Sequence, residues 1–274
     1  MRALEKMHPV PCFLYFTAVI GLTIFSRDPV ILAESLIGAV LAAALAGKAL
    51  PLLPAAAVIT LTNPLFSHNG VTVLFFVGDL SITLEALAYG LAFSVMLCAA
   101  AQWGAVSARF LTSDKYIWLF GRVLPSAGLT LSCAVRFVPL FIGRTRDFIG
   151  SRKASTIREM ASAFSDSLGY SAEEAMTTAD SMKSRGYGSA KRTFYSSYRM
   201  TGSDIRALVF IVICGGAALA LSFFAPAFYY YPAVSSLKFN IVNVLLYIFF
   251  GAICIMPTAI IVHEKILCSV TSRS

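Results

Sequence analysis

Two arginines of this sequence lie in short motifs whose composition suits contact with acidic groups. Ser184-Arg185-Gly186 and Ser151-Arg152-Lys153 each place a small residue before an arginine and a turn-prone or polar residue after it. Each motif follows a segment predicted to be helical, so both arginines are expected at helix ends. A guanidinium is planar, stays charged when partly buried and binds a carboxylate through two parallel hydrogen bonds. The two motifs therefore predict contacts with acidic groups of another protein.

The helix that carries Arg185 is polar in an otherwise apolar chain. Ser171 followed three residues later by Glu174 is a capping-box pattern, and a glycine closes the segment 171–188. Another capping box at Thr156 predicts a preceding helix that ends at Gly169. The prediction is two short helices separated at this glycine, and docking to a water-soluble partner is the proposed reason for the polar one.

The composition places this chain in a membrane. Its 274 residues are 58% hydrophobic and 13% charged, with a formal net charge of +8. Soluble domains carry about 25% charged residues, so most of this surface is expected to face lipid. The length suits one all-α, polytopic membrane domain with a polar insert, and it leaves no room for a separate soluble enzyme domain.

Five apolar segments are each long enough to cross a bilayer, which takes about 20 residues. They are Pro9 to Ser26, Val30 to Gly47, Leu84 to Ser107, Ile205 to Ala227 and Phe239 to Val262. A sixth apolar stretch, Leu50 to Val77, is interrupted by prolines and by a Ser-His-Asn-Gly turn, which predicts one interrupted helix or two half-spans. Counting it once gives about six transmembrane helices.

The basic residues favour one orientation of these helices. With the N-terminus in the cytoplasm, 20 of the 22 basic residues lie inside, and only Arg27 and Lys238 lie outside. This bias follows the positive-inside rule and predicts a multi-pass protein of the cytoplasmic (inner) cell membrane. The chain then divides into N-terminal transmembrane helices over 1–108, a cytoplasmic insert over 109–205 and C-terminal transmembrane helices over 206–274.

The first half of the insert has two possible placements. From Tyr116 to Lys153 it is apolar, yet it carries Arg122 and Arg136 and contains two prolines. A seventh spanning helix is one reading, but two arginines inside the bilayer are costly. An amphipathic helix that lies along the interface, with its arginines reaching toward water, fits this pattern better.

Catalytic signatures are absent from the sequence. Gly47-Lys48 lacks the upstream glycine and the following hydroxyl of a phosphate-binding loop, and no HExxH or GxSxG motif occurs. The six cysteines are far apart, so neither a zinc site, nor another cofactor, nor a disulfide framework is indicated. Membrane topology already accounts for the basic face, so nucleic-acid binding is not required. The chain is not expected to be an enzyme.

Several further motifs run along almost the whole chain. They are His8-Pro9 before the first span, Asn63-Pro64-Leu65-Phe66 with Gly70 after it, Arg136-Phe137-Val138-Pro139 in the insert, and Ala179 followed by Ser184-Arg185-Gly186-Tyr187-Gly188. With them, the chain resembles the transmembrane T component of energy-coupling factor (ECF) transporters, which import vitamins and metal ions and are related to ABC transporters. Family members carry two motifs of small residue, arginine and small residue at the tips of two coupling helices.

The resemblance implies a scaffold in the lipid bilayer that works with other subunits. Those partners are two ATP-binding cassette ATPases and a small substrate-binding membrane subunit, the S component. The implied ATPase-coupling residues are Ser151, Arg152 and Lys153 in the first motif and Ser184, Arg185 and Gly186 in the second. Lys153 departs from the family pattern, which requires a small residue there. The cargo, a vitamin or other micronutrient, is chosen in the family by the S component.

Three other functions compete with this one. A permease of an ordinary ABC importer would pair with a soluble binding protein, and Glu174-Ala175 weakly matches its coupling loop. A membrane anchor without transport activity would bind soluble partners through the same insert. An intramembrane enzyme would need a nucleophile with a base, and the serines of the predicted spans have no evident base nearby in sequence.

Overall fold

The protein is described here by a computed structural model covering residues 7–47, 50–67, 70–77, 80–123, 125–151, 156–187, 198–226, 228–236 and 240–271. The chain forms two compact units, which we call unit 1, Met1–Thr112 with Arg199–Ser274, and unit 2, Ser113–Tyr198. Unit 2 lies wholly within the 109–205 segment that the sequence sets apart as an insert.

Helices make up most of both units. Unit 1 contains α2 (Pro9–Phe25), α3 (Pro29–Ala46), α4 (Leu53–Phe66), β1 (Val73–Val77), β2 (Leu80–Thr83), α5 (Leu84–Phe110), α9 (Gly202–Phe224) and α10 (Ile241–Thr271). Unit 2 contains α6 (Ser113–Val123), α7 (Pro125–Ser151) and α8 (Ile157–Ser184).

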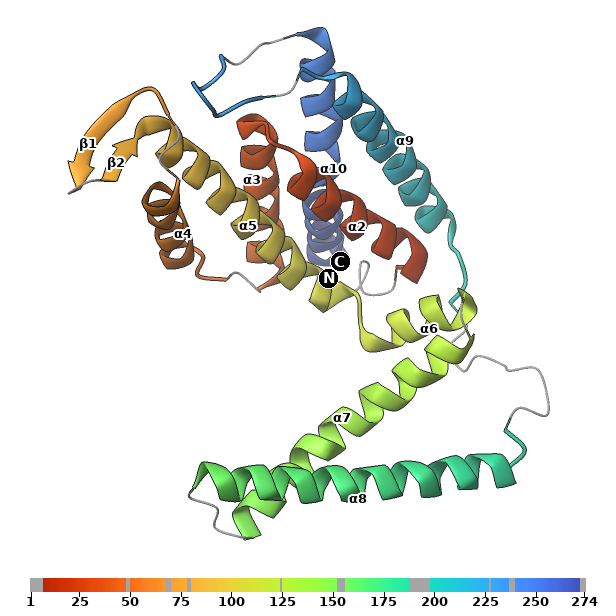
Figure 1. Cartoon of the computed structure of the whole chain (residues 1–274). Helices are drawn as coiled ribbons and strands as arrows, with labels where there is room; N and C mark the ends of the chain where they lie inside the picture. The colour runs from red at the N-terminus through yellow and green to blue at the C-terminus, as the bar shows by residue number, and fades with distance from the viewer. Residues whose placement is uncertain are drawn as a thin grey trace. The chain divides into compact units, whose positions relative to one another are not determined.

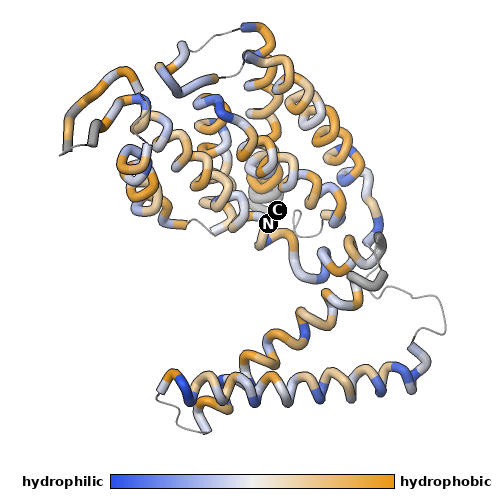
Figure 2. Tube along the Cα trace, viewed as in Figure 1, coloured by the Kyte–Doolittle hydropathy of each residue, from blue (hydrophilic) through white to orange (hydrophobic). Residues whose placement is uncertain are grey.

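Among the described residues, four helices of unit 1 are long and apolar enough to cross a membrane, namely α3, α5, α9 and α10. Orange and pale orange predominate along them in Figure 2, whereas blue residues recur along α8. Of the six predicted passes, the first forms the 17-residue α2 and the 50–77 stretch forms the 14-residue α4, both shorter apolar helices. The chain is thus a mostly helical, membrane-embedded protein.

The helices of unit 1 close into a ring. α5 contacts α2 and α3, α3 contacts α10, α10 contacts α9, and α9 returns to α2. α4 joins this ring through α5 (Figure 1). Gly90 permits that contact, because a Cβ at this position would lie 2.8 Å from the backbone oxygen of Thr60 in α4. Small residues allow close helix approach where lipid supplies no hydrophobic driving force.

Buried hydroxyl and indole groups inside the ring bond to one another. Trp103 is fully buried and donates its indole N–H to the Ser35 hydroxyl at 3.1 Å. That hydroxyl also bonds with the hydroxyl of Thr23 at 2.7 Å. Tyr15 donates its hydroxyl to the backbone oxygen of Ile253 in α10, 3.2 Å away. These bonds satisfy polar groups that would be costly to bury alone.

A β-hairpin follows α4, which the all-α prediction did not include. β1 and β2 pair antiparallel, with Val73 opposite Thr83. The 50–77 stretch is therefore one short helix and a strand, which corrects the prediction of one interrupted helix or two half-spans. Valine, leucine and phenylalanine dominate Val73–Val77, and such residues favour strands. Thr72 donates its N–H to the Glu85 carboxylate at 3.2 Å, which ties the hairpin to α5.

The amphipathic half of the insert forms two helices, α6 and α7. Pro125 begins α7, a position where proline removes no helical hydrogen bond. The two helices approach closely at Gly128, where a Cβ would lie 2.3 Å from the Cα of Gly121. α7 is not among the helices found long and apolar enough to cross a membrane, and Arg136 on it is exposed.

α8 is a single helix of 28 residues, which corrects the prediction of two helices divided at Gly169. The capping box at its start is present, since Thr156 donates its N–H to Glu159 at 3.2 Å. The predicted box at Ser171 is wrong, because Ser171 lies inside α8 and Glu174 pairs instead with Arg144 of α7.

Packing explains why α8 continues through Gly169. Glycine inside a helix costs only about 1 kcal/mol relative to alanine. On the N-terminal side of Gly169, Ala163 and Ser167 are buried, and on its C-terminal side Glu174 bonds to α7. Contacts on both sides of the glycine therefore outweigh the local preference for a helix end.

Candidate functional site

The end of α8 adopts the geometry of a Schellman motif. Gly186 has φ +78°, and its N–H bonds to the backbone oxygen of Lys183 at 3.0 Å. The next N–H, of Tyr187, bonds to the backbone oxygen of Met182 at 3.0 Å. This pair of bonds needs a left-handed residue one position beyond the helix cap, and glycine adopts that conformation without a steric penalty. The left-handed backbone conformation at position 186 therefore favours glycine over any other residue.

The same geometry fixes the position of Arg185. It is the cap residue of α8, with φ −80° and ψ 7°, and its N–H bonds to the backbone oxygen of Ser181 at 3.2 Å. Its backbone is therefore anchored on both sides, while its side chain is exposed. Ser184 is also exposed and donates its hydroxyl to the Ser181 carbonyl at 2.9 Å. The sequence prediction of an arginine at a helix end is confirmed for this motif.

The first motif is only partly described. Ser151 is the last residue of α7, is exposed, and donates its hydroxyl to the backbone oxygen of Asp147 at 2.8 Å. Arg152 and Lys153 lie outside the described residues. The serine of each motif therefore ends its helix, at α7 in one case and at α8 in the other.

The two motifs lie toward opposite ends of α8. Four residues separate Ser151 from Thr156, which begins α8, and Arg185 caps the far end. A helix rises 1.5 Å per residue, so the 28 residues of α8 span roughly 40 Å. The described residue of the first motif, Ser151, is thus joined to one end of α8 by a short segment, and Arg185 caps the other end.

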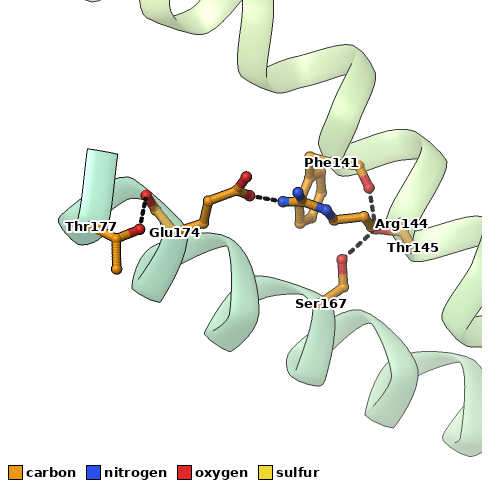
Figure 3. A network of polar contacts seen from close by, with 6 residues as sticks. All are labelled: Phe141, Arg144, Thr145, Ser167, Glu174 and Thr177. Atoms are coloured by element: carbon orange, nitrogen blue, oxygen red, sulfur yellow. Dashed lines mark hydrogen bonds and ion pairs between the residues drawn. The ribbon is translucent and has the colours of Figure 1, made fainter. Parts of the chain in front are cut away.

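A network of polar contacts joins α7 to α8 (Figure 3). Arg144 of α7 donates to the carboxylate of Glu174 in α8 and forms an ion pair with it. Its guanidinium also lies over the ring of Tyr170, 4.9 Å from the centroid. The next residue of α7, Thr145, has its hydroxyl 2.8 Å from that of Ser167 in α8. These bonds fix the rotation of one helix against the other.

Apolar packing accompanies the polar contact. The rings of Phe141 and Phe164 meet edge to face, with centroids 5.6 Å apart. Aromatic pairs of this kind add about 0.5–1.5 kcal/mol beyond the area they bury. Residues of α7 at 141, 144 and 145 share one helix face and meet residues of α8 at 164, 167, 170 and 174.

The sequence did not reveal this contact. The sequence pattern assigned Glu174 to a capping box, because Ser171 lies three residues before it. The available signal was the spacing from Phe164 through Ser167 and Tyr170 to Glu174, which keeps a helical period across Gly169. Neither Arg144 nor Thr145 carries a local pattern that predicts its partner.

Unit 2 also exposes large apolar side chains. On α7, Val138 and Ile142 are each 54% exposed, and on α8 Ile157 and Met176 are 81% and 64% exposed. Val138 and Ile142 are four residues apart and share one helix face, an arrangement that suits contact with lipid or with another protein. The described residues contain no group of three His, Cys, Asp or Glu side chains that could hold a metal ion.

Comparison of the sequence with models of known protein families, and with curated proteins, finds no match. The geometry of the helix ends and of the contact between α7 and α8 is therefore the basis for a functional assignment.

Proposed function

We propose that this chain is the T component of an ECF-type importer, the membrane scaffold that couples two ATPases to a separate S component. The observation that carries the proposal is the end of α8, where a Schellman motif holds an exposed arginine at the tip of a long helix. Unit 1 supplies the membrane-embedded part of such a scaffold, and unit 2 supplies its coupling helices. The cargo is a vitamin or another micronutrient captured by the S component.

The chemistry of Arg185 suits a site that must stay attached while its partner moves. A guanidinium can bind one carboxylate through two hydrogen bonds and keeps its charge when buried. Removing one arginine from a desolvated interfacial pair costs about 2–5 kcal/mol, because its acidic partner is left unpaired. An acidic groove on each ATPase is therefore the complement that these helix tips require.

Coupling would use α8 as a rigid link between two such attachments. Arg152 at one end and Arg185 at the other would each enter one of two ATPases. When ATP binding brings the ATPases together, the pull on the two attachments would shift or tilt α8 as a whole, and the contact at Arg144 and Glu174 would make α7 move with it. The S component would then tilt in the membrane and expose its cargo to the cytoplasm.

The exposed apolar side chains of unit 2 have a place in this proposal. Val138, Ile142 and Met176 would face the membrane interface or the S component instead of water. A surface of this kind transmits motion by packing, since aliphatic side chains form no directional bonds that must break when the partner moves.

The test is replacement of Arg152 and Arg185 by alanine together in the complete complex. We expect loss of co-purification with the ATPases and loss of ATP-driven uptake, while the chain remains in the membrane. The matched control is Arg199→Ala, which removes an exposed arginine from unit 1 and should change neither readout. Normal assembly and uptake in the double variant would refute the proposal.

A further inference from the structure

Unit 1 contains a cavity of about 620 Å³ that the proposed coupling function does not use. Its wall comes from five places in the chain: the end of α2 with the two residues after it, the first turn of α3, the end of α4, the segment 89–96 of α5, and the segment 228–231 after α9. Sites for small molecules in proteins occupy about 300–1,000 Å³, so this cavity is large enough to hold a ligand. All of these except the α5 segment lie where helices of unit 1 begin or end, which is where a lipid headgroup would lie.

Seven of the fifteen residues that line the cavity are aromatic, and several of their rings contact one another. Tyr89 of α5 contacts Tyr230 and Tyr231, with ring centroids 5.6 Å and 5.5 Å apart. Phe228 packs edge to face on Tyr230 at 4.9 Å. Burial raises the pKa of Tyr230 to about 12, so its hydroxyl stays neutral at physiological pH. Tyrosine and tryptophan gather at membrane interfaces, where an apolar ring can meet lipid and a polar tip can meet water.

A basic residue, Arg27, lies among the residues that line the cavity. Arg27 lines the cavity between α2 and α3, and no ion pair joins its side chain to any residue in the described part of the chain. Its backbone oxygen accepts a hydrogen bond from the Tyr230 hydroxyl at 3.0 Å, which fixes the arginine backbone against the aromatic segment. The site therefore combines apolar walls with an exposed arginine whose backbone is held against them, a combination that complements an anion carrying a hydrocarbon chain.

The cavity is also continuous with the apolar surface of unit 1. Phe25, which is 88% exposed, and Phe93, which is 39% exposed, both line it. A hydrocarbon chain that lies on this surface would meet these two rings at the cavity. Asn63 and Ser67 lie in the same lining and hold it together: the Asn63 amide donates to the backbone oxygen of Ala86 at 2.6 Å, and the Ser67 hydroxyl bonds with the hydroxyl of Tyr231 at 3.3 Å.

We infer that this cavity binds one anionic phospholipid, with Arg27 contacting its phosphate and the aromatic wall contacting the glycerol and upper acyl chain. A lipid is favoured over a soluble phosphate compound because the walls are apolar and open to the membrane surface. An anionic lipid is favoured over a zwitterionic one because Arg27 brings a positive charge that forms no ion pair with the adjacent Asp28 or with any other carboxylate among the described residues.

The test is native mass spectrometry of the full chain in detergent, with equal amounts of dioleoyl phosphatidylglycerol and dioleoyl phosphatidylcholine added. The chain should retain the anionic lipid in preference, and Arg27→Gln should lower that preference about fivefold, the effect of one arginine near a membrane surface. Arg206→Gln, which removes an exposed arginine at the start of α9, should preserve it. Ser26→Trp fills the cavity beside an intact Arg27 and should also abolish lipid retention.

Three results would overturn the inference. One is an unchanged preference in Arg27→Gln, and another is an equal loss in Arg206→Gln, which would indicate general attraction to basic residues. The third is binding of added inorganic phosphate that depends on Arg27 while the anionic lipid does not bind. Each of these outcomes leaves the coupling proposal untouched, since neither Arg152 nor Arg185 takes part.

Discussion

The two units of this protein hold their helices together in different ways. In unit 1 the contacts are close and largely apolar: Gly90 lets α5 approach the backbone of α4, and the buried hydroxyls of Ser35 and Tyr15 bond to other buried groups or to the backbone. In unit 2 the contact between α7 and α8 includes an ion pair that is only partly buried, with side chains 26% and 32% exposed, beside an aromatic pair. The comparison teaches that the contacts of unit 1 resist rearrangement, whereas part of the contact between α7 and α8 is reached by water.

The largest effect should come from filling the close contact in unit 1. Gly90→Ala places a Cβ 2.8 Å from the backbone oxygen of Thr60, so α4 and α5 must separate. Overpacking of this kind costs about 1–3 kcal/mol. Gly104 lies on the same helix with nothing within 4 Å of its Cβ position, and Gly104→Ala should instead stabilise the protein slightly.

Thermal unfolding of both alanine variants in detergent provides the measurement. The melting temperature should fall for Gly90→Ala and hold or rise for Gly104→Ala. Equal changes in the two variants would mean that the contact between α4 and α5 is not close.

A second pair of glycines sharpens the comparison inside unit 2. Gly186 has φ +78°, a conformation that costs an alanine about 1–2 kcal/mol, so Gly186→Ala should loosen the end of α8. Gly169 lies within α8 with open space at its Cβ position, so Gly169→Ala should strengthen the helix by up to about 1 kcal/mol.

Hydrogen exchange of the α8 amides in the full chain separates these two effects. Exchange should become faster near 182–187 in the first variant and slower near 165–175 in the second. Faster exchange in Gly169→Ala would show that α8 is interrupted at this glycine, as the sequence pattern first suggested.

The smallest effect should come from the ion pair of unit 2. Glu174→Ala removes the partner of Arg144, and a half-exposed pair of this kind contributes about 1 kcal/mol or less. The control is Glu173→Ala, because Glu173 is exposed and has no contact with Arg144 among the described residues. Amide exchange on α7 and on α8 should become faster in Glu174→Ala only. A similar change in Glu173→Ala would mean that the effect comes from the lost negative charge on the helix and not from the ion pair.

Local patterns predicted several features of the fold. The capping box at Thr156, the arginine at the end of α8 and the membrane-embedded character of the chain all follow from residues close together in sequence. The first two depend on the chemistry of helix ends, and the third depends on hydrophobicity summed over a window of residues. None of the three requires knowledge of tertiary contacts.

Features that depend on contacts between residues far apart in the sequence could not be predicted from local patterns. The continuity of α8 through Gly169 depends on its packing against α7, and the pairing of Arg144 with Glu174 joins residues thirty positions apart. The hairpin Val73–Thr83 was hidden because a short apolar run suits a helix or a strand equally well. In the sequence, Arg27 is notable only as one of two basic residues predicted to lie on the outer side of the membrane. Its position beside an aromatic cavity is visible only in the fold.

Site-specific crosslinking tests the central claim most directly. A photoreactive amino acid in place of Tyr187, next to the Arg185 tip, should form a covalent adduct with an ATP-binding cassette ATPase in intact membranes that contain the whole complex. The same group in place of Tyr229, on the segment predicted to face the other side of the membrane, should form none. An adduct from position 229, or the absence of one from position 187 in assembled complexes, would contradict the assignment of α8 as a coupling helix.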